Sequence, residues 1–193
     1  VAGTYQPSTG QASCLDADAG HYVDIAGQSA QTACAAGTYQ ASTGQSSCLD
    51  ADAGHYVGST AATTQAACVA GTYQPSTGQA SCLDADAGHY VGSTAATSQT
   101  ACAAGTYQPS TGQSSCLDAD AGHYVDTNGS VTQTPCLAGT YQPSQNSTGC
   151  ISADPGHHVP NTGGTTQSEC QPGTYQGLAG QASCAPTPPG TYT

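Results

Sequence analysis

The cysteines of this 193-residue chain stand at regular positions, with two spacings that alternate along the whole sequence. They are Cys14, Cys34, Cys48, Cys68, Cys82, Cys102, Cys116, Cys136, Cys150, Cys170 and Cys184. One long and one short spacing together make a 34-residue repeating unit. Inside it, a Gly recurs at every 17th position and is followed two places later by Tyr, with His158 as the exception. This double period predicts a tandem-repeat architecture.

Each 34-residue unit contains two homologous halves, C-x-x-G-T-Y-Q-x-S-T-G-Q-x-S-C and A-D-A-G-H-Y-V. The predicted repeats are 1–33, which lacks its first Cys, then 34–67, 68–101, 102–135, 136–169 and a partial repeat 170–193. Neither end carries an atypical capping repeat, and such arrays normally need one. We therefore expect the segment to come from a longer array.

The disulfide pattern follows from which cysteines are absent together. Aligning the halves places Ala51 and Gln65 where Cys34 and Cys48 stand, and joint absence is what a bonded pair would show. We favour the pairs Cys34–Cys48, Cys68–Cys82, Cys102–Cys116, Cys136–Cys150 and Cys170–Cys184, with Cys14 paired upstream of this segment. A ladder that links Cys14 to Cys34 and Cys48 to Cys68 is equally regular, and spacing alone does not exclude it.

The chain lacks the material for a thick hydrophobic core. Phe, Trp and Met are absent, and Leu, Ile and Val together number 16. Disulfides take over part of the role of a core in such sequences. In each first half, Gly-Thr-Tyr-Gln is a β-prone run and Gln-Ala-Ser-Cys is the predicted return strand of a hairpin. Between them lies a turn signal, as at Pro75 to Gly78. We expect a small disulfide-rich, mostly β and irregular fold without helices: an elongated tandem-repeat rod with one short hairpin per 17-residue half-repeat.

Tyrosine offers the largest apolar surface in each half-repeat, and its hydroxyl can stay hydrated. An isolated hairpin is marginally stable in water, so neighbouring hairpins must contribute stability. We predict stacking between half-repeats through Tyr5, Tyr22, Tyr39, Tyr56, Tyr73, Tyr90, Tyr107, Tyr124, Tyr141 and Tyr175.

The charge of the chain restricts its partners. There is no Lys or Arg, and the formal net charge is −12. Nucleic-acid binding and attachment to anionic lipid both depend on cationic side chains. No apolar run approaches the roughly 20 residues of a membrane-spanning helix. We expect neither nucleic-acid binding nor membrane insertion in this segment, and the disulfides favour an extracellular or cell-surface location.

The pattern C-x-x-G-T-Y-x-x-x-x-G-x-x-x-C, as in Cys34 to Cys48, resembles the ephrin-receptor-like cysteine-rich repeat, a relative of modules in TNF-receptor-type ectodomains. The resemblance covers the whole array. That family usually carries C-x-x-C at the junctions, whereas here half of the usual cysteines are missing, as at Ala51 and Gln65. The resemblance implies an elongated extracellular module and supplies no catalytic residues.

Paired aspartates are the most suggestive polar motif. Two carboxylates one residue apart before a Gly resemble the opening of a Ca²⁺ loop, but the third acidic ligand and the distal Glu are absent. The Ca²⁺ candidates are Asp16, Asp18, Asp50, Asp52, Asp84, Asp86, Asp118 and Asp120. A solvated acidic turn is the competing interpretation, and we expect no cofactor to be required.

The remaining polar groups recur with the repeat. The histidines that precede the second-half Tyr position are His21, His55, His89, His123 and His157. Metal sites need three or four convergent donors, so we interpret these side chains as stacking or hydrogen-bonding groups. Because every polar group recurs four or five times and an enzyme usually breaks the symmetry at one site, we expect no enzymatic activity.

Covalent glycans are a further expectation. N-glycosylation sequons begin at Asn128 and Asn146. O-glycans could attach at predicted turn tips, at Ser8, Thr9, Ser76, Thr77, Ser110 and Thr111.

Two functions fit this sequence. The first is a structural protein that self-associates into filaments, as a segment of a surface fibre or stalk. The alternative is a repeat ectodomain of an adhesin or receptor that binds protein or carbohydrate ligands. Near-identical repeats favour the first, and exposed tyrosines and the family resemblance favour the second.

Overall fold

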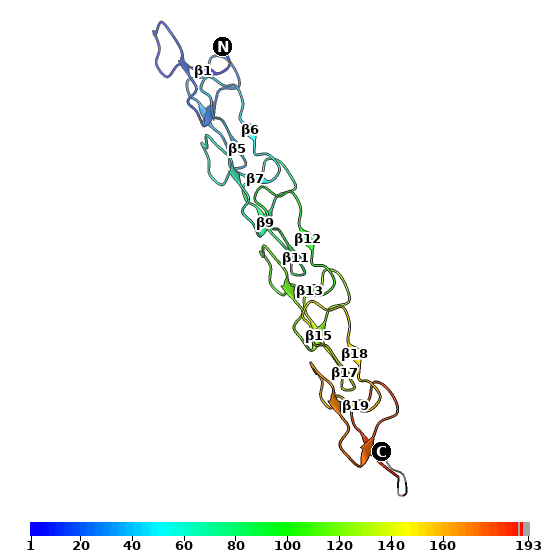
Figure 1. Ribbon diagram of the computed structural model, residues 1–193. Helices are drawn as coiled ribbons and strands as arrows, with labels where there is room; N and C mark the ends of the chain where they lie inside the picture. Colours follow the sequence, from blue (N-terminus) through cyan, green and yellow to red (C-terminus); the bar gives the residue numbers. More distant parts are fainter. Residues whose placement is uncertain (189, 191–193) are drawn as a thin grey trace. The chain divides into compact units, whose positions relative to one another are not determined.

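The computed structural model describes residues 1–188 and residue 190. This described part of the chain contains no helix and forms eleven two-stranded antiparallel sheets. One hairpin lies in each half-repeat (Figure 1), which confirms the predicted disulfide-rich, tandem-repeat hairpin fold. The end of the sixth predicted repeat, at residues 189 and 191–193, lies outside the described residues.

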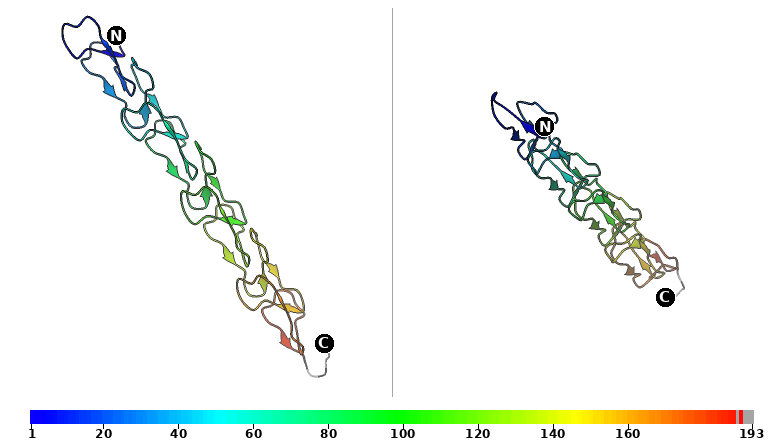
Figure 2. Two further views of the ribbon diagram at one scale, coloured as in Figure 1. Left: turned by 60° about the vertical axis from the view of Figure 1, so that its left-hand side comes forward. Right: turned by 90° about the horizontal axis from the view of Figure 1, so that it is seen from above.

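The residues divide into two compact units. Near the middle of the chain, segments of one unit alternate with segments of the other along the sequence. The first unit contains Val1–Ala85, Val91–Gln99 and Gly112–Ser114. The second contains Asp86–Tyr90, Thr100–Thr111 and the chain from Ser115 onward. Within each unit the hairpins follow one another in sequence order (Figure 2).

Every strand is two residues long and pairs with its neighbour in sequence. The hairpins of the first unit are β1 (Thr4–Tyr5) with β2 (Leu15–Asp16), β3 (His21–Tyr22) with β4 (Thr32–Ala33), β5 (Thr38–Tyr39) with β6 (Leu49–Asp50), β7 (His55–Tyr56) with β8 (Ala66–Ala67), and β9 (Thr72–Tyr73) with β10 (Leu83–Asp84). Those of the second unit are β11 (His89–Tyr90) with β12 (Thr100–Ala101), β13 (Thr106–Tyr107) with β14 (Leu117–Asp118), β15 (His123–Tyr124) with β16 (Thr134–Pro135), β17 (Thr140–Tyr141) with β18 (Ile151–Ser152), β19 (His157–His158) with β20 (Ser168–Glu169), and β21 (Thr174–Tyr175) with β22 (Ala185–Pro186).

The two kinds of half-repeat share one hairpin register. In β5 and β6, Tyr39 lies opposite Leu49. In β7 and β8, one half-repeat further on, Tyr56 lies opposite Ala66. The halves with and without cysteines are therefore structural equivalents.

The return strand begins later in the chain than the sequence predicts. The sequence predicts that Gln-Ala-Ser-Cys, which ends at Cys82, forms the return strand. In the structure the return strand is β10, which begins at Leu83. Residues 74–82 form a loop around the buried side chain of Gln74. Its Nε2 donates to the carbonyl oxygen of Ser81 (2.8 Å), and its Oε1 accepts from the N–H of Ser76 (3.1 Å). These bonds satisfy loop backbone groups that would otherwise lose their partners on burial.

Main-chain hydrogen bonds join each half-repeat to the next within a unit. Between the halves that begin at Cys34 and Ala51, they run from Gly37 N–H to Val57 C=O (2.7 Å), from Gln40 N–H to Ala62 C=O (3.0 Å) and from Ala61 N–H to Cys34 C=O (2.8 Å). In the second unit the equivalent bonds run from Gly105 to Val125, from Gln108 to Ser130 and from Gly129 to Cys102. Because only backbone groups take part, the linkage tolerates different side chains.

The buried side chains of each unit are those of Ala, Cys, Val and Gln. One set of buried side chains stands at the first position of nine half-repeats, and another directly follows the Tyr position, or His158 in its place. The first set is Ala17, Cys34, Ala51, Cys68, Ala85, Cys102, Ala119, Cys136 and Ala153. The second set is Val23, Val57, Val91, Val125 and Val159 in second halves and Gln40, Gln74, Gln108 and Gln142 in first halves. This interior fits the low content of large apolar residues.

Gly71 shows why a Gly recurs in every half-repeat. Its φ is +90°, in the left-handed region that side chains disfavour. A Cβ added there would also collide with the carbonyl oxygen of Gly112, in the equivalent half of the next repeat. Conformation and close approach therefore both require Gly at this position.

Replacing Gly71 with Ala should open this part of the first unit. The left-handed conformation alone costs a non-Gly residue about 1–2 kcal/mol, and relief of the collision adds to that cost. Hydrogen exchange should accelerate at the N–H groups of Gly71 and Gly112, which both donate main-chain hydrogen bonds.

Gly149→Ala is the matched control for this substitution. Gly149 has no positive φ, and a Cβ added there meets no atom within 4 Å. The control should leave hydrogen exchange unchanged. Unaltered exchange in the Gly71 variant as well would contradict the role given to this Gly.

Candidate functional site

Five disulfides close the hairpin loops of the first halves. They are Cys34–Cys48, Cys68–Cys82, Cys102–Cys116, Cys136–Cys150 and Cys170–Cys184, each with a sequence separation of 14. These are the pairs that the joint absence of cysteines favours, and the structure does not form the rival ladder. Cys14 is exposed and has no disulfide partner among the described residues.

In the second halves, a side-chain hydrogen-bond pair takes the place of the disulfide. Gln65 stands at the position equivalent to Cys48. Its Oε1 accepts from the N–H of Asp52 (2.6 Å), and its Nε2 donates to Asp52 Oδ2 (2.6 Å). The same two bonds join Asp18 to Gln31, Asp120 to Gln133 and Asp154 to Gln167. Each pair closes a loop that lacks a disulfide.

The Gln–Asp closure was missed by the sequence analysis, although its signal is present there. Gln recurs where the second Cys is lost, and Asp recurs one place after the lost first Cys. The sequence shows that these two residues recur, but it does not show that their side chains meet. The fold brings the two side chains together.

This closure bears on the Ca²⁺ candidates, all eight of which are exposed. One carboxylate oxygen of Asp18, Asp52 and Asp120 already accepts a hydrogen bond from a Gln. Within the described chain, the one group of three or more metal-ligating side chains consists of His158, Cys170 and Cys184 and includes no Asp. Ca²⁺ binding by the aspartates stays a prediction.

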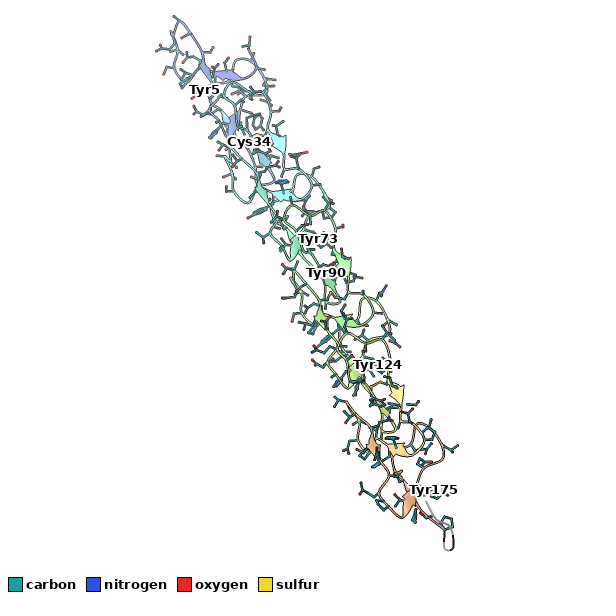
Figure 3. All side chains as sticks on the ribbon, viewed as in Figure 1. Tyr5, Cys34, Tyr73, Tyr90, Tyr124 and Tyr175 are labelled. Atoms are coloured by element: carbon teal, nitrogen blue, oxygen red, sulfur yellow. A yellow bond between two sulfur atoms is a disulfide. The ribbon has the colours of Figure 1, made fainter. Side chains whose placement is uncertain are left out.

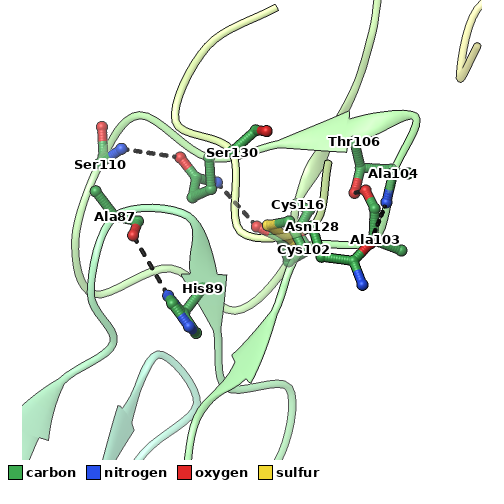
Figure 4. The surroundings of a disulfide bond; sticks show 12 residues. Ala87, His89, Cys102, Ala103, Ala104, Thr106, Ser110, Cys116, Asn128 and Ser130 are labelled. Carbon is green, nitrogen blue, oxygen red and sulfur yellow. Dashed lines mark hydrogen bonds between the residues drawn. A yellow bond between two sulfur atoms is a disulfide. The ribbon is translucent and has the colours of Figure 1, made fainter. Parts of the chain in front are cut away.

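The histidines that recur with the repeat make one local contact. Nδ1 of His55 lies 3.3 Å from the carbonyl oxygen of Ala53. The same contact, to the carbonyl two residues earlier, is 3.4 Å long at His21, His89, His123 and His157. Figure 4 shows it for His89 and Ala87. A hydrogen bond to the preceding turn is thus the contact that these side chains share.

The glycosylation candidates are exposed, both the two Asn and the turn-tip residues Ser8, Thr9, Ser76, Thr77, Ser110 and Thr111. Asn128 Oδ1 accepts a hydrogen bond from the N–H of Ala104 (2.9 Å; Figure 4), which does not use the amide nitrogen that carries an N-glycan. Asn146 has φ +56°, at a position where other repeats have Gly. Asn tolerates this left-handed conformation better than most residues.

The tyrosines are half-buried in the described chain except for Tyr175, which is exposed. Tyr73 in the first unit and Tyr124 in the second both lie on hairpin strands (Figure 3). The links that recur between half-repeats are main-chain hydrogen bonds. Stacking through a ladder of tyrosines stays a prediction.

Second-half tyrosines line open grooves that also include a cysteine of a disulfide. In the first unit, a groove of about 290 Å³ is lined by Tyr56, Thr72 and Cys82 among others. In the second unit, equivalent grooves of about 450 and 390 Å³ are lined by Tyr90, Thr106 and Cys116 and by Tyr124, Thr140 and Cys150. Each groove is therefore lined by both an aromatic ring and a hydroxyl.

The one departure from the Tyr period lies beside a disulfide. Nδ1 of His158 is 3.4 Å from Sγ of Cys184, and the three ligand atoms of His158, Cys170 and Cys184 lie within 4.8 Å of one another. All three side chains are half-buried. The sequence signal was the break in the Tyr pattern at His158.

No protein-family model matches this chain, and no curated protein matches it. The resemblance to ephrin-receptor-like repeats stays a prediction. Among the described residues, no helix has the length and apolar character that crossing a bilayer requires. The five disulfides indicate a secreted or surface protein rather than a cytosolic one.

The equivalence of the two closures predicts that a disulfide can be moved into a second half. In the double variant Ala51→Cys, Gln65→Cys, the thiols stand where Cys34 and Cys48 stand in a hairpin of the same register. A sixth disulfide should form. Closing a 15-residue loop stabilises by about 3 kcal/mol in the chain-entropy model, and the lost Gln65 hydrogen bonds offset about 1 kcal/mol.

Non-reducing peptide mapping and denaturant unfolding measure this outcome. Gln65→Ala is the matched control, and it should lower the unfolding free energy by about 1 kcal/mol, because it removes both hydrogen bonds to Asp52. Two free thiols in the double variant would show that the halves are not equivalent.

Proposed function

We propose that this chain is a structural segment of an extracellular or cell-surface fibre or stalk built from stacked, disulfide-closed repeats. The observation that carries the proposal is the recurrence of the same main-chain hydrogen bonds from each half-repeat to the next within both units. Links of this kind depend on backbone geometry and set no limit to the number of repeats.

The distribution of polar groups supports a structural role rather than a catalytic one. The grooves beside the disulfides repeat the same combination of Tyr, Thr and Cys. A catalytic centre gathers its nucleophile, base and stabilising donors at one place. We therefore propose that the chain has no enzymatic activity.

The chain is also suited to persist outside cells. Covalent closure in the first halves restricts local opening, and proteases that cleave after Lys or Arg find no such residue. The charge of −12 favours solubility. Glycans on the exposed Asn128 and Asn146 would add a further hydrated layer.

A fibre requires contact between copies, and exposed apolar side chains recur on the first halves. In the first unit, Leu15, Leu49 and Leu83 are 50%, 51% and 47% exposed, and Leu117 and Ile151 are similarly exposed in the second. Each lies opposite a Tyr across its hairpin. An apolar pair in every repeat matches the period of another copy of this chain, so we propose self-association into filaments through these pairs.

The grooves favour a second candidate function. Tyr90 and Thr106 line one open groove, and Tyr124 and Thr140 line another, so each groove contains an aromatic ring and a hydroxyl. Such combinations bind carbohydrate or protein ligands. A repeat ectodomain of an adhesin or receptor would use the grooves in series.

Immunogold electron microscopy of the source material, with an antibody against this chain, distinguishes the two. The fibre proposal predicts continuous filaments labelled along their length. Gold on separate particles anchored at the cell surface would instead support the adhesin or receptor. Labelling confined to the cell interior would contradict both candidates.

A further inference from the structure

The sequence contains a single Asn-Gly pair, Asn128-Gly129, in the loop between β15 and β16. Asn-Gly is chemically labile in a flexible chain. The main-chain nitrogen after Asn attacks the side-chain Cγ, ammonia leaves, and a five-membered succinimide forms. Gly in the second position presents no side chain to hinder the attack. The other two Asn, Asn146 and Asn161, precede Ser and Thr. The array therefore concentrates this reactivity at one loop.

The fold holds both reacting groups of this pair. The N–H of Gly129 donates to the carbonyl oxygen of Cys102 (2.8 Å). Oδ1 of Asn128 accepts from the N–H of Ala104 (2.9 Å; Figure 4). Both partners belong to the half-repeat at residues 102–118, whereas the Asn-Gly pair belongs to the half-repeat at residues 119–135. The nucleophile and the carboxamide are thus both bonded to the neighbouring half-repeat.

These bonds act on the reaction in different ways. Attack requires the Gly129 nitrogen to lose its proton, and that proton is the one shared with the Cys102 carbonyl. A donor on Oδ1 of Asn128 would by itself make Cγ more electrophilic, so suppression of the reaction depends on the bond from Gly129. This bond breaks when the two half-repeats separate, and local openings of this kind occur in folded proteins. The reaction is therefore coupled to separation of the half-repeats.

We propose that Asn128 is a deamidation site controlled by the contact between half-repeats 102–118 and 119–135. When the contact opens, the Gly129 nitrogen bonds to Cγ of Asn128 and the Cγ–Nδ2 bond breaks. Nδ2 leaves as ammonia with the proton from the Gly129 nitrogen. Water then opens the succinimide at either carbonyl and gives Asp or isoaspartate, so the sequence of steps needs no oxidant or reductant. The inference is independent of the fibre proposal.

Deamidation at this site changes the contact that controls it. Isoaspartate carries the main chain through Cβ and Cγ, which lengthens the backbone by one carbon immediately before Gly129. There is little room for this change, because a Cβ added at Gly88 would already collide with the Gly129 carbonyl oxygen. An N-glycan attaches to the same Nδ2 that leaves as ammonia. Deamidation therefore hinders reclosure and removes the N-glycosylation candidate at Asn128.

The full oxidised chain, produced without N-glycans, tests the control by the fold. It is incubated at mildly alkaline pH beside the same chain that has been reduced, alkylated and unfolded in urea. Peptide mapping by mass spectrometry then separates Asn, Asp and isoaspartate at position 128. Deamidation of Asn128 should be at least roughly tenfold slower in the folded chain, because only the small open fraction reacts. Equal rates in the two chains would overturn the proposal.

Gly88→Ala tests the contact itself. Gly88 has φ +80°, and its new Cβ would push against the carbonyl of Gly129. Hydrogen exchange at the Gly129 N–H and deamidation at Asn128 should both accelerate. Gly20→Ala is the matched control, because Gly20 has φ +81° and its Cβ would collide in the same way with the Ala61 carbonyl in the first unit. It should leave both rates at the Asn-Gly pair unchanged.

Urea below the unfolding transition provides a second test that needs no substitution. Exchange at the Gly129 N–H and deamidation at Asn128 should rise in proportion as urea promotes opening. Deamidation that stays constant while exchange rises, in urea or in the Gly88 variant, would overturn the proposal, because the reaction would then occur in the closed contact.

Gly129→Ala tests which atom attacks. Ala61 and Ala95 occupy the equivalent position with φ +54°, so the fold accommodates Ala there. In the unfolded chain this variant should slow deamidation at Asn128, because the Cβ hinders attack by its nitrogen. An unchanged rate would indicate direct hydrolysis by water and would contradict the proposed reaction.

Discussion

Main-chain hydrogen bonding between successive half-repeats is the interaction on which the rest of this structure depends. The backbones also approach closely between half-repeats two apart, and the recurring Gly fits both this approach and its own left-handed conformation. Gly71 has a positive φ, and any side chain there would collide with the carbonyl of Gly112. Close approach also explains the interior, where Ala51 and Cys68 are buried at the same position of alternate halves. Large apolar residues are unnecessary because the backbone makes the contacts.

Equivalent loops in the two kinds of half-repeat are closed by two different interactions. A covalent bond joins Cys34 to Cys48, and two hydrogen bonds between Gln65 and Asp52 hold the equivalent loop in the next half. The missing cysteines therefore do not leave the second halves open. A disulfide restricts the unfolded chain as well as the folded one, whereas a Gln–Asp pair acts only in the folded state. The two halves of a repeat should accordingly differ in stability while sharing one geometry.

Much of this arrangement is predictable from the sequence, and the remainder has a physical reason for being hidden. The repeat length, one hairpin per half and the pairing of each first-half cysteine with the next one along the chain follow from periodicity and joint absence. The position of the return strand does not, because turn residues such as Pro75 and Gly78 are also compatible with the longer loop held by Gln74. The main-chain hydrogen bonds that recur between half-repeats involve no side chain and leave no signal beyond the Gly. The contact of His158 with Cys184 joins two different half-repeats, and the sequence marks it only as a break in the Tyr pattern.

If backbone coupling between half-repeats holds the fold, stability must grow with the number of repeats. Oxidised chains of one, two, three and four 34-residue repeats, built from residues 68–101, test this by hydrogen exchange and denaturant unfolding. The single repeat should exchange nearly all its N–H groups rapidly although its disulfide is intact, and protection should rise steeply with each added repeat. A single oxidised repeat that unfolds cooperatively, with the same protection as the four-repeat chain, would contradict the account, because each repeat would then be stable without its neighbours.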